Sequence, residues 1–328
     1  MINLETSYLG LKLKNPIIVS SSGLTNSVEK IGKLVDAGVG AVVLKSLFEE
    51  QINHEISNSI QSGEGFDYPE AMDYIKEYTK ENNVNHYLAL VKDTKSAYDI
   101  PVIASINCFS TGHWIEFAKK IEDAGADAIE LNVYVLNTEK YSKSEDYERI
   151  YYDILTDIKK EVNIPVVMKL GLYFSNLVGV VDTLSAHGAS GVVLFNRFYE
   201  PDINIDKMQM STAEVFSSST DLRRTLRWVA IISDKVHDIE VSASTGIHSG
   251  EDVIKVLLAG ATTAQVCSAI YKGGAEVITS MLGELTKWME EKEFNSISDF
   301  NGSMNYGKIE NPALYERSQF MKYFSSLE

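Results

Sequence analysis

Polar side chains recur where short apolar runs of this sequence end. Lys45 ends one such run, Asn132 ends another, and Lys169 lies near the end of a third. Polar groups in these positions are costly unless they bind something, so we expect them to line a site. The other residues so placed are Ser20, Ser21, Ser22, Gly23, Ser46, Asn107, Cys108, Asn196, Arg197, Ser244, Thr245, Gly246, Cys267 and Ser268.

Two segments of small residues indicate phosphate binding. SASTGIHSGED at 242–252 and CSAIYKGGAE at 267–276 each offer hydroxyl and backbone N–H groups before a helical stretch. Helix N-termini and their N–H groups attract phosphate. Small residues also suit tight turns, which is the alternative interpretation.

Two lysines near the ends of apolar runs indicate which phosphorylated cofactor the site would bind. A flavin that accepts a hydride gathers negative charge near N1 and the C2 carbonyl, where a fixed cation stabilises it. Lys169, in PVVMKLG, is placed for that role, and Lys45 is placed to contact both ring and substrate. The alternative is a lysine whose stem packs while its amine reaches solvent. Together with the phosphate segments, the lysines predict FMN.

Eight short runs that carry these residues read as strands. Most hold three or more consecutive apolar residues, as buried parallel strands do, and 239–244 is the weakest. Their bounds are 16–21, 41–46, 101–106, 128–133, 165–170, 191–196, 239–244 and 263–268.

Helical patterns follow the strands and repeatedly end before glycine, as at Gly38 and Gly125, where a helix C-cap needs positive φ. Alternation of strand and helix predicts βαβ units, and closing eight of them removes the sheet edges. We therefore predict an α/β fold, a (β/α)8 TIM barrel, as one domain over 1–328. The predicted helices are 27–37, 114–124, 144–162, 175–187, 221–236, 250–259 and 274–290.

Two connections are long, 47–81 after the second strand and 197–220 after the sixth. Both leave the carboxyl ends of strands, where barrel active sites form, so we expect lids or substrate walls. Surface insertions are the alternative. Residues 4–16 are expected to form a hairpin that closes the barrel floor, and the tail after Phe294 to pack on the outside.

Composition excludes several classes of function. A formal net charge of −16 argues against nucleic acid and anionic membranes as partners. The sequence has no apolar run long enough for a membrane span and no signal-peptide pattern. Two cysteines cannot hold an iron–sulfur cluster and fit a reducing, cytoplasmic location. The histidines lack metal-ligand spacing, so we expect no metal.

The motifs NPIIVSSSG, LKS, DAGADAIELN, PVVMKL and STGIHSGEDVIKVLLAGATTAQVCSAIYKGG, in this order, resemble the dihydroorotate dehydrogenase family from Asn15 to about Phe300. The resemblance implies an FMN-dependent barrel that oxidises dihydroorotate to orotate in pyrimidine synthesis. It also implies a small-molecule substrate and a homodimer. The membrane class of the family adds an N-terminal hydrophobic helix, which this sequence lacks.

The resemblance also implies roles for the strand-end residues. Ser21, Ser22 and Gly23 would lie against the isoalloxazine ring, and Lys169 would face N1. Further flavin contacts would come from Lys45, Ser46, Asn107, Asn132, Asn196 and Ser244, and phosphate contacts from Thr245, Gly246, Cys267 and Ser268. Lys45, Ser46 and Asn132 would also touch the substrate, which makes Lys45 and Asn132 candidate catalytic residues.

The substrate region departs from the family pattern. The family's N-x-S-C-P-N loop here reads Asn132 to Asn137, NVYVLN, so Val135 stands where a Cys or Ser base is usual. Tyr134 is the neighbouring candidate base, and Asn137 and Arg197 are candidate substrate contacts. The guanidinium of Arg197 suits a carboxylate, with a salt bridge to a loop acid as the alternative.

Two other functions remain open at this point. One is a phosphate-binding lyase or isomerase without flavin. The other is a flavin-binding homologue whose catalysis is lost or whose substrate has changed.

Overall fold

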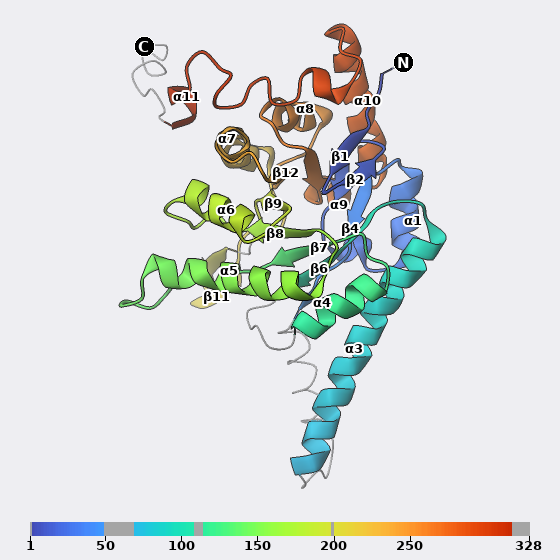
Figure 1. The fold of residues 1–328 in the computed structure, drawn as a ribbon, viewed down its shortest axis with the longest axis vertical. Coiled ribbons are helices and arrows are strands. Elements are labelled where there is room, and N and C mark those ends of the chain that lie inside the picture. The colour runs from blue at the N-terminus through green and yellow to red at the C-terminus, as the bar shows by residue number, and fades with distance from the viewer. Residues whose placement is uncertain (1, 49–68, 108–113, 198–199, 317–328) are drawn as a thin grey trace.

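The computed structural model describes residues 2–48, 69–107, 114–197 and 200–316 (Figure 1). Eight parallel strands close into a barrel, because β3 pairs with both β4 and β13 and β4 also pairs with β6. The predicted (β/α)8 fold is confirmed, including the weak seventh strand. The barrel strands are β3 (Ile17–Val19), β4 (Ala41–Val43), β6 (Val102–Asn107), β7 (Ala128–Asn132), β8 (Val166–Leu170), β9 (Gly191–Leu194), β12 (Glu240–Ser244) and β13 (Thr263–Val266).

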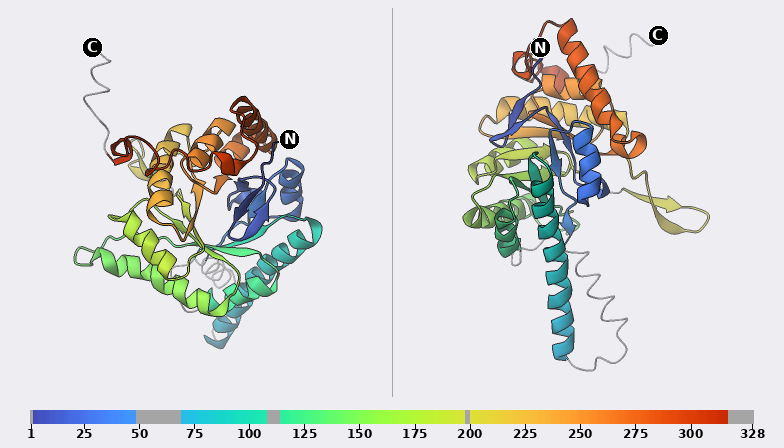
Figure 2. Two further views of the ribbon diagram at one scale, coloured as in Figure 1. Left: turned by 45° about the horizontal axis from the view of Figure 1, so that its top comes forward. Right: turned by 90° about the vertical axis from the view of Figure 1, so that its right-hand side faces the viewer.

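Helices surround the barrel, as the left view of Figure 2 shows. The glycines at two predicted helix ends, Gly38 and Gly125, have φ of +97° and +96°. Every predicted helix is present within a few residues, and α9 (Ser268–Gly273) adds a helix of six residues after the last strand. The others are α1 (Val28–Asp36), α4 (Trp114–Asp123), α5 (Ser144–Glu161), α6 (Leu177–Ala186), α7 (Leu222–Lys235), α8 (Gly250–Leu258) and α10 (Glu276–Glu291).

The first long connection differs from the predicted loop. It holds a two-residue strand, β5 (Leu47–Phe48), and its last part belongs to α3 (Pro69–Ala97), a helix of 29 residues. The prediction missed α3 because its apolar residues do not gather on one face along its length. Residues 49–68 of this connection, and Cys108, lie outside the described residues.

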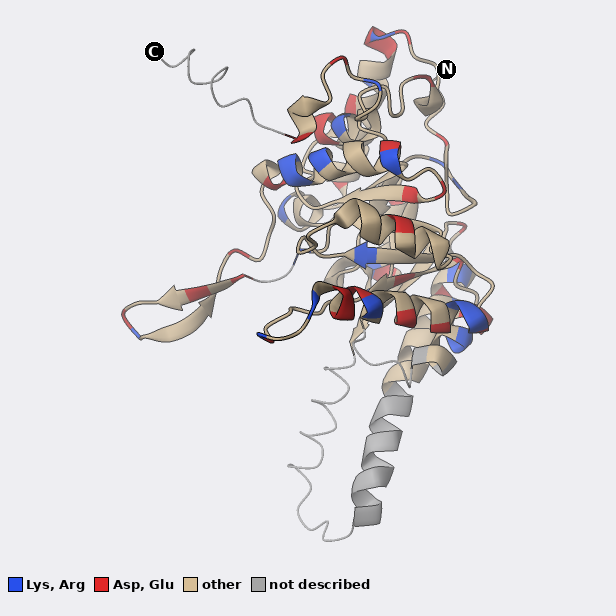
Figure 3. Cartoon of the chain, turned by 60° about the vertical axis from the view of Figure 1, so that its left-hand side comes forward, with Lys and Arg blue, Asp and Glu red and all other residues tan. Residues whose placement is uncertain are grey.

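The second long connection also contains regular structure. The strands β10 (Pro201–Asn204) and β11 (Gln209–Thr212) pair as an antiparallel hairpin. This hairpin stands away from the barrel in Figure 2 (right) and Figure 3. The short 3-10 helix η2 (Ser219–Asp221) then leads into α7. Most of the hairpin is exposed, so burial patterns in the sequence gave no sign of it.

The barrel floor is closed by the predicted N-terminal hairpin. The strands β1 (Thr6–Tyr8) and β2 (Leu11–Leu13) pair there, and Tyr8 and Leu13 are buried against the inner face of the barrel. The backbone N–H of Leu9 donates to the carboxylate of Glu240 at the start of β12. This expectation is confirmed.

Inside the barrel, an apolar layer lies beneath a polar one. Ile18, Ile103, Ala128 and Val167 belong to the inner apolar cluster. Side chains alternate along a strand, so residues two positions further on also point inward. These are Ser20, Ser105, Glu130 and Lys169, all buried. The polar layer therefore underlies the carboxyl ends of the strands.

The tail packs against the outer helices, as expected. Phe300 is buried and its ring meets that of Trp288 edge-on at 5.0 Å. The N–H groups of Gly302 and Met304 donate to carbonyl groups at the end of α8. The remaining elements are η3 (Ile297–Asp299) and α11 (Ala313–Glu316).

Acidic and basic residues are interspersed along the helices that face the viewer in Figure 3. Among the described residues, no helix combines the length and the apolar character that crossing a membrane requires.

Candidate active site

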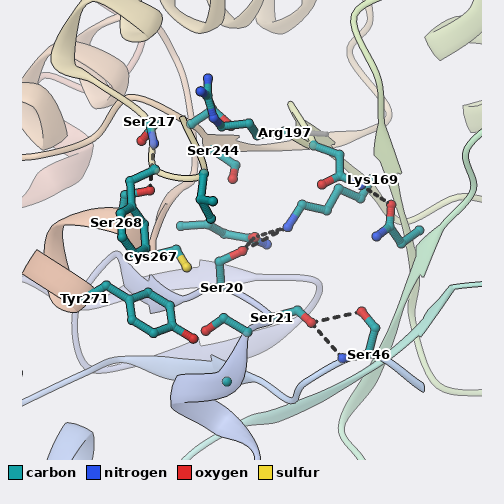
Figure 4. Close-up of a pocket in the computed structure, with 18 of the residues that line it drawn as sticks. Ser20, Ser21, Ser46, Lys169, Arg197, Ser217, Ser244, Cys267, Ser268 and Tyr271 are labelled. Carbon is teal, nitrogen blue, oxygen red and sulfur yellow. Dashed lines mark hydrogen bonds between the residues drawn. The ribbon is translucent and has the colours of Figure 1, made fainter. Parts of the chain in front are cut away.

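A cavity of about 560 Å³ lies at the carboxyl ends of the strands (Figure 4). Its volume is in the range of cofactor sites. Of the predicted residues that the structure describes, Asn107, Tyr134 and Asn137 lie outside its lining. Those that line it are Ser21, Ser22, Gly23, Lys45, Ser46, Asn132, Lys169, Asn196, Arg197, Ser244, Thr245, Gly246, Cys267 and Ser268.

One end of the cavity is a strained turn after β12. Thr245 has φ of +80°, and its hydroxyl donates to the carbonyl of Phe195 at 2.9 Å. A β-branched residue with positive φ is an outlier that persists only where its surroundings hold it. Gly246 follows with φ of +86°, and a Cβ there would lie 2.2 Å from the backbone nitrogen of Leu222. The turn is therefore fixed against the first turn of α7.

The second long connection covers this same end. The Ser217 N–H donates to the Ser268 hydroxyl at 3.0 Å, and the Ser217 hydroxyl lies 3.1 Å from Nε2 of His248. Lys272 donates to the Ser217 carbonyl at 3.2 Å. Burial, and then the charge of Lys272, lower the pKa of His248, so the imidazole is neutral at neutral pH. The sequence did not single out Ser217 or Lys272.

Gly23 and Tyr271 meet at another wall. A Cβ at Gly23 would lie 2.7 Å from the Tyr271 hydroxyl, so only glycine at this position leaves room for the Tyr271 side chain without a shift. The Tyr271 ring in turn lies 5.4 Å from that of Phe216. Prediction from the sequence missed both aromatic residues, because neither follows an apolar strand directly.

A chain of hydroxyl groups fixes the wall between β3 and β6. Ser21 and Ser46 are 2.9 Å apart through their hydroxyls, and Ser46 and Ser105 are 2.7 Å apart. The Ser46 N–H also donates to the Ser21 hydroxyl at 2.8 Å. Behind them, the Tyr87 hydroxyl bonds the backbone of Ser105, and burial raises the pKa of this phenol strongly.

Lys169 lies at the bottom of the cavity in a buried network (Figure 4). Its amine donates to Ser20 Oγ at 2.9 Å, Gln265 Oε1 at 3.1 Å and Glu130 Oε1 at 3.3 Å. Gln265 Nε2 donates to the other oxygen of Glu130 at 2.7 Å. The sequence analysis did not name Glu130. The signal that could have found it is its place two residues before Asn132, which puts both on the inner face of one strand.

Two predicted asparagines meet across the cavity. Asn196 donates through its side-chain amide to the side-chain oxygen of Asn132. Asn107 faces Asn132 in the register between β6 and β7, although it does not line the cavity. Elsewhere in the lining, burial raises the pKa of the Cys267 thiol, which keeps it protonated.

Arg197 lies between this cavity and a second one of about 430 Å³, and it lines both. Its guanidinium donates to the Asp221 carboxylate at 3.2 Å and to the Glu214 carbonyl at 3.0 Å. Arg197 therefore forms a salt bridge, which was the alternative to a role in binding a substrate carboxylate. It nevertheless lines the first cavity as well.

Residues 134–137, in the loop that departs from the family pattern, do not line the first cavity. Tyr134 lines the second cavity, as Tyr173 does. The pKa of Tyr134 is raised, mainly by burial and to a lesser extent by the neighbouring Tyr173. Val135 packs against the core. Asn137 is exposed and accepts a hydrogen bond from the Ser142 hydroxyl at 2.8 Å.

The fold and this cavity define a (β/α)8 barrel with a cofactor-sized pocket at the carboxyl ends of its strands. The model of one family, dihydroorotate dehydrogenase, matches residues 3–289, and the chain belongs to this family. It is accordingly a flavin-dependent oxidoreductase that acts on CH–CH groups.

The curated relatives are distant in sequence. The NAD-dependent dihydropyrimidine dehydrogenase subunit PreA of Escherichia coli K12 is 25% identical, covering 92% of this chain and 77% of the relative. The catalytic subunit of dihydroorotate dehydrogenase B (NAD(+)) from Thermoplasma volcanium is 25% identical, covering 92% and 98%. That of Methanocaldococcus jannaschii is 24% identical, covering 88% and 94%.

Proposed function

We propose that the cavity of about 560 Å³ binds FMN and that the protein oxidises a small cyclic substrate, dihydroorotate or a relative of it. The observation that carries the proposal is one cavity with small residues of two strand ends on one side and buried Lys169 at its bottom.

The donor set fits a phosphorylated flavin. Thr245 and Gly246 on one strand end, and Cys267 and Ser268 on the next, would hold the phosphate through hydroxyl and backbone N–H groups. Ser21, Ser22 and Gly23 would carry the ring, since their small side chains leave room for a flat group. Gly23 already approaches Tyr271 too closely for any larger residue without a shift.

When bound, FMN supplies a hydride acceptor for the substrate carbon. Asn132 and Asn196, whose amides already contact one another, would hydrogen-bond the flavin, and Asn132 would also orient the substrate. Lys45, half-buried at the rim, would contact both ring and substrate. Asn107, Asn137 and Tyr134 would need a shift of their segments to take part, because they lie outside the cavity lining.

Purification tests the cofactor. We expect about one FMN per chain, seen as the yellow colour and visible absorption of oxidised flavin and identified by mass after release. A colourless, folded protein that takes up no added FMN would sink the proposal.

A second version of this function rests on Val135. A valine at the position of the usual proton acceptor favours a flavoprotein whose substrate is not dihydroorotate. Reduction of the bound flavin by a panel of dihydropyrimidines, with and without a carboxylate, separates the two versions.

We also propose a homodimer acting in pyrimidine metabolism, as the family resemblance implies. The names of the relatives include the word subunit, so the mass in solution should be measured on the protein alone.

A further inference from the structure

A buried ion pair lies directly beneath the proposed flavin site. Lys169 on β8 and Glu130 on the neighbouring strand β7 are 3.3 Å apart, with side chains 6% and 1% exposed. Gln265 on β13 joins them, accepting from the amine at 3.1 Å and donating to the carboxylate at 2.7 Å. Three strands thus converge on one pair of opposite charges.

The amine of Lys169 is directed by partners inside the barrel. A lysine ammonium has three donors, and Ser20, Gln265 and Glu130 accept from this one. Its place at the bottom of the cavity is therefore set before a cofactor arrives. Because the pair is shielded from water, the carboxylate cancels much of the field that the amine would otherwise project into the cavity.

We propose that Glu130 is a positioning residue that holds Lys169 under the flavin and limits how much of its positive charge the flavin feels. The inference rests on the proposed function, since it requires a bound flavin. Reduced flavin carries the added negative charge, so a cation beneath it favours reduction. The carboxylate opposes that effect and keeps the reduction potential below the value that Lys169 alone would give.

The groups around the pair decide whether a shift in a Glu130 variant can be assigned to the amine of Lys169. The other titratable or charged groups around the pair come from different elements. They are Tyr8 on β1, Tyr87 on α3, Cys267 after β13 and Lys45 after β4. Burial raises the pKa of both phenols and of the thiol, so these three stay neutral between about pH 6 and 8.

The test is the reduction potential of the flavin-loaded protein, measured by equilibration with reference dyes. Glu130→Gln should shift the ratio of the dissociation constants of oxidised and reduced flavin at least tenfold towards the reduced form. For a two-electron couple this is a rise of about 30 mV. Glu130→Asp keeps the negative charge but moves it further from the Lys169 amine, so it should raise the reduction potential less.

Asp127→Asn is the matched control. Asp127 pairs with Lys95 at 2.9 Å, just before β7 begins, so this variant loses the same charge at the far end of the strand. Its potential should equal that of the wild type.

Each result decides the inference. If both variants bind flavin and the reduction potential of Glu130→Gln shifts no more than that of Asp127→Asn, this inference alone is overturned. If Glu130→Gln does not fold, Glu130→Asp decides in the same way. A wild type that takes up no flavin overturns the proposed function and this inference with it.

Discussion

The guanidinium of Arg197, which lines both cavities at the mouth of the barrel, donates at 3.2 Å to the carboxylate of Asp221, which lines the second cavity. Both side chains are 27% exposed. The positive charge that suits a substrate carboxylate is therefore partly compensated before any substrate binds.

Asp221→Asn should tighten the binding of a carboxylated ligand. Freed from its partner, Arg197 should bind orotate up to about fivefold more tightly, because a partly exposed pair is worth at most about 1 kcal/mol. Binding of uracil, which has no carboxylate, should not change. Titration of the flavin spectrum measures both. Asp202→Asn, the same charge change on the exposed strand β10, is the control. Equal effects on the two ligands would show that Arg197 does not meet the carboxylate.

The barrel was predictable because its strands are buried on both faces and its helices end in glycine. Runs such as 41–46 (AVVLKS) and 191–196 (GVVLFN) contain too many consecutive apolar residues for an exposed strand. The helix α3 and the hairpin β10–β11 were not predictable in this way. Tyr87, Val91 and Thr94 of α3 are buried, but its apolar residues do not gather on one face along the whole helix, and the hairpin is mostly exposed.

The site was predictable where strand ends carry polar residues, as at Lys169 and Ser268. It was missed where partners come from elsewhere. Glu130 lies within its strand and does not line the cavity, and Tyr271 and Ser217 reach the cavity from a helix and a connection. The pairing of Arg197 with Asp221 depends on how a connection folds back, which spacing along the chain does not specify.

Gly246→Ala should destabilise the fold and weaken FMN binding. The new methyl group would meet the backbone of Leu222, and the residue would keep a φ of +86°. Gly10→Ala is the control, because Gly10 has φ of +75° with nothing within 4 Å of a Cβ. Backbone strain of about 1–3 kcal/mol is common to both. Thermal unfolding and FMN titration should show a larger loss for Gly246→Ala, and equal losses would argue against the close contact.

Lys169→Met should cost more stability alone than together with Glu130→Gln. Removing one partner of a buried pair costs about 3–5 kcal/mol, since the other charge is left unpaired. The double variant loses both charges and should recover part of that cost. Urea unfolding of flavin-free protein measures the difference. A double variant less stable than Lys169→Met would contradict the ion pair.

Glu240→Gln should change the pH dependence of stability. Burial raises the pKa of Glu240, so its protonated form is favoured in the folded protein. Its contribution is therefore full below the unfolded pKa of about 4.3 and is lost as pH rises through the folded value. Glutamine mimics the protonated acid and still accepts from Leu9, so the variant should exceed the wild type at pH 7 and match it near pH 4.

Glu29→Gln is the control, because its effect on stability at pH 7 should have the opposite sign. Lys33 lowers the pKa of Glu29, so this variant should lose a little stability at pH 7. Unfolding curves for both variants at the two pH values test the pair of expectations. A Glu240→Gln variant that is less stable at pH 7 would contradict the prediction.

The altered loop makes the sharpest prediction about catalysis. Val135 cannot accept a proton, and proton transfer by a positioned side chain is typically worth about 10² to 10⁴ in rate. We expect dihydroorotate oxidation to be slow at neutral pH even with FMN bound. Val135→Cys should raise the rate by supplying a thiol at the family's position, provided that its segment can turn towards the cavity. Stopped-flow reduction of the flavin measures this step without an electron acceptor.

Tyr134 is the competing base, and its pH profile distinguishes it. Burial and Tyr173 raise the pKa of Tyr134, so the phenolate forms only in alkaline solution. A phenolate base would make the rate climb with pH and collapse in Tyr134→Phe. Because Tyr134 lines the second cavity, we expect Tyr134→Phe to have little effect on flavin reduction. Brisk reduction by dihydroorotate at pH 7, unaffected by Tyr134→Phe, would refute the slow rate and place the base outside residues 132–137.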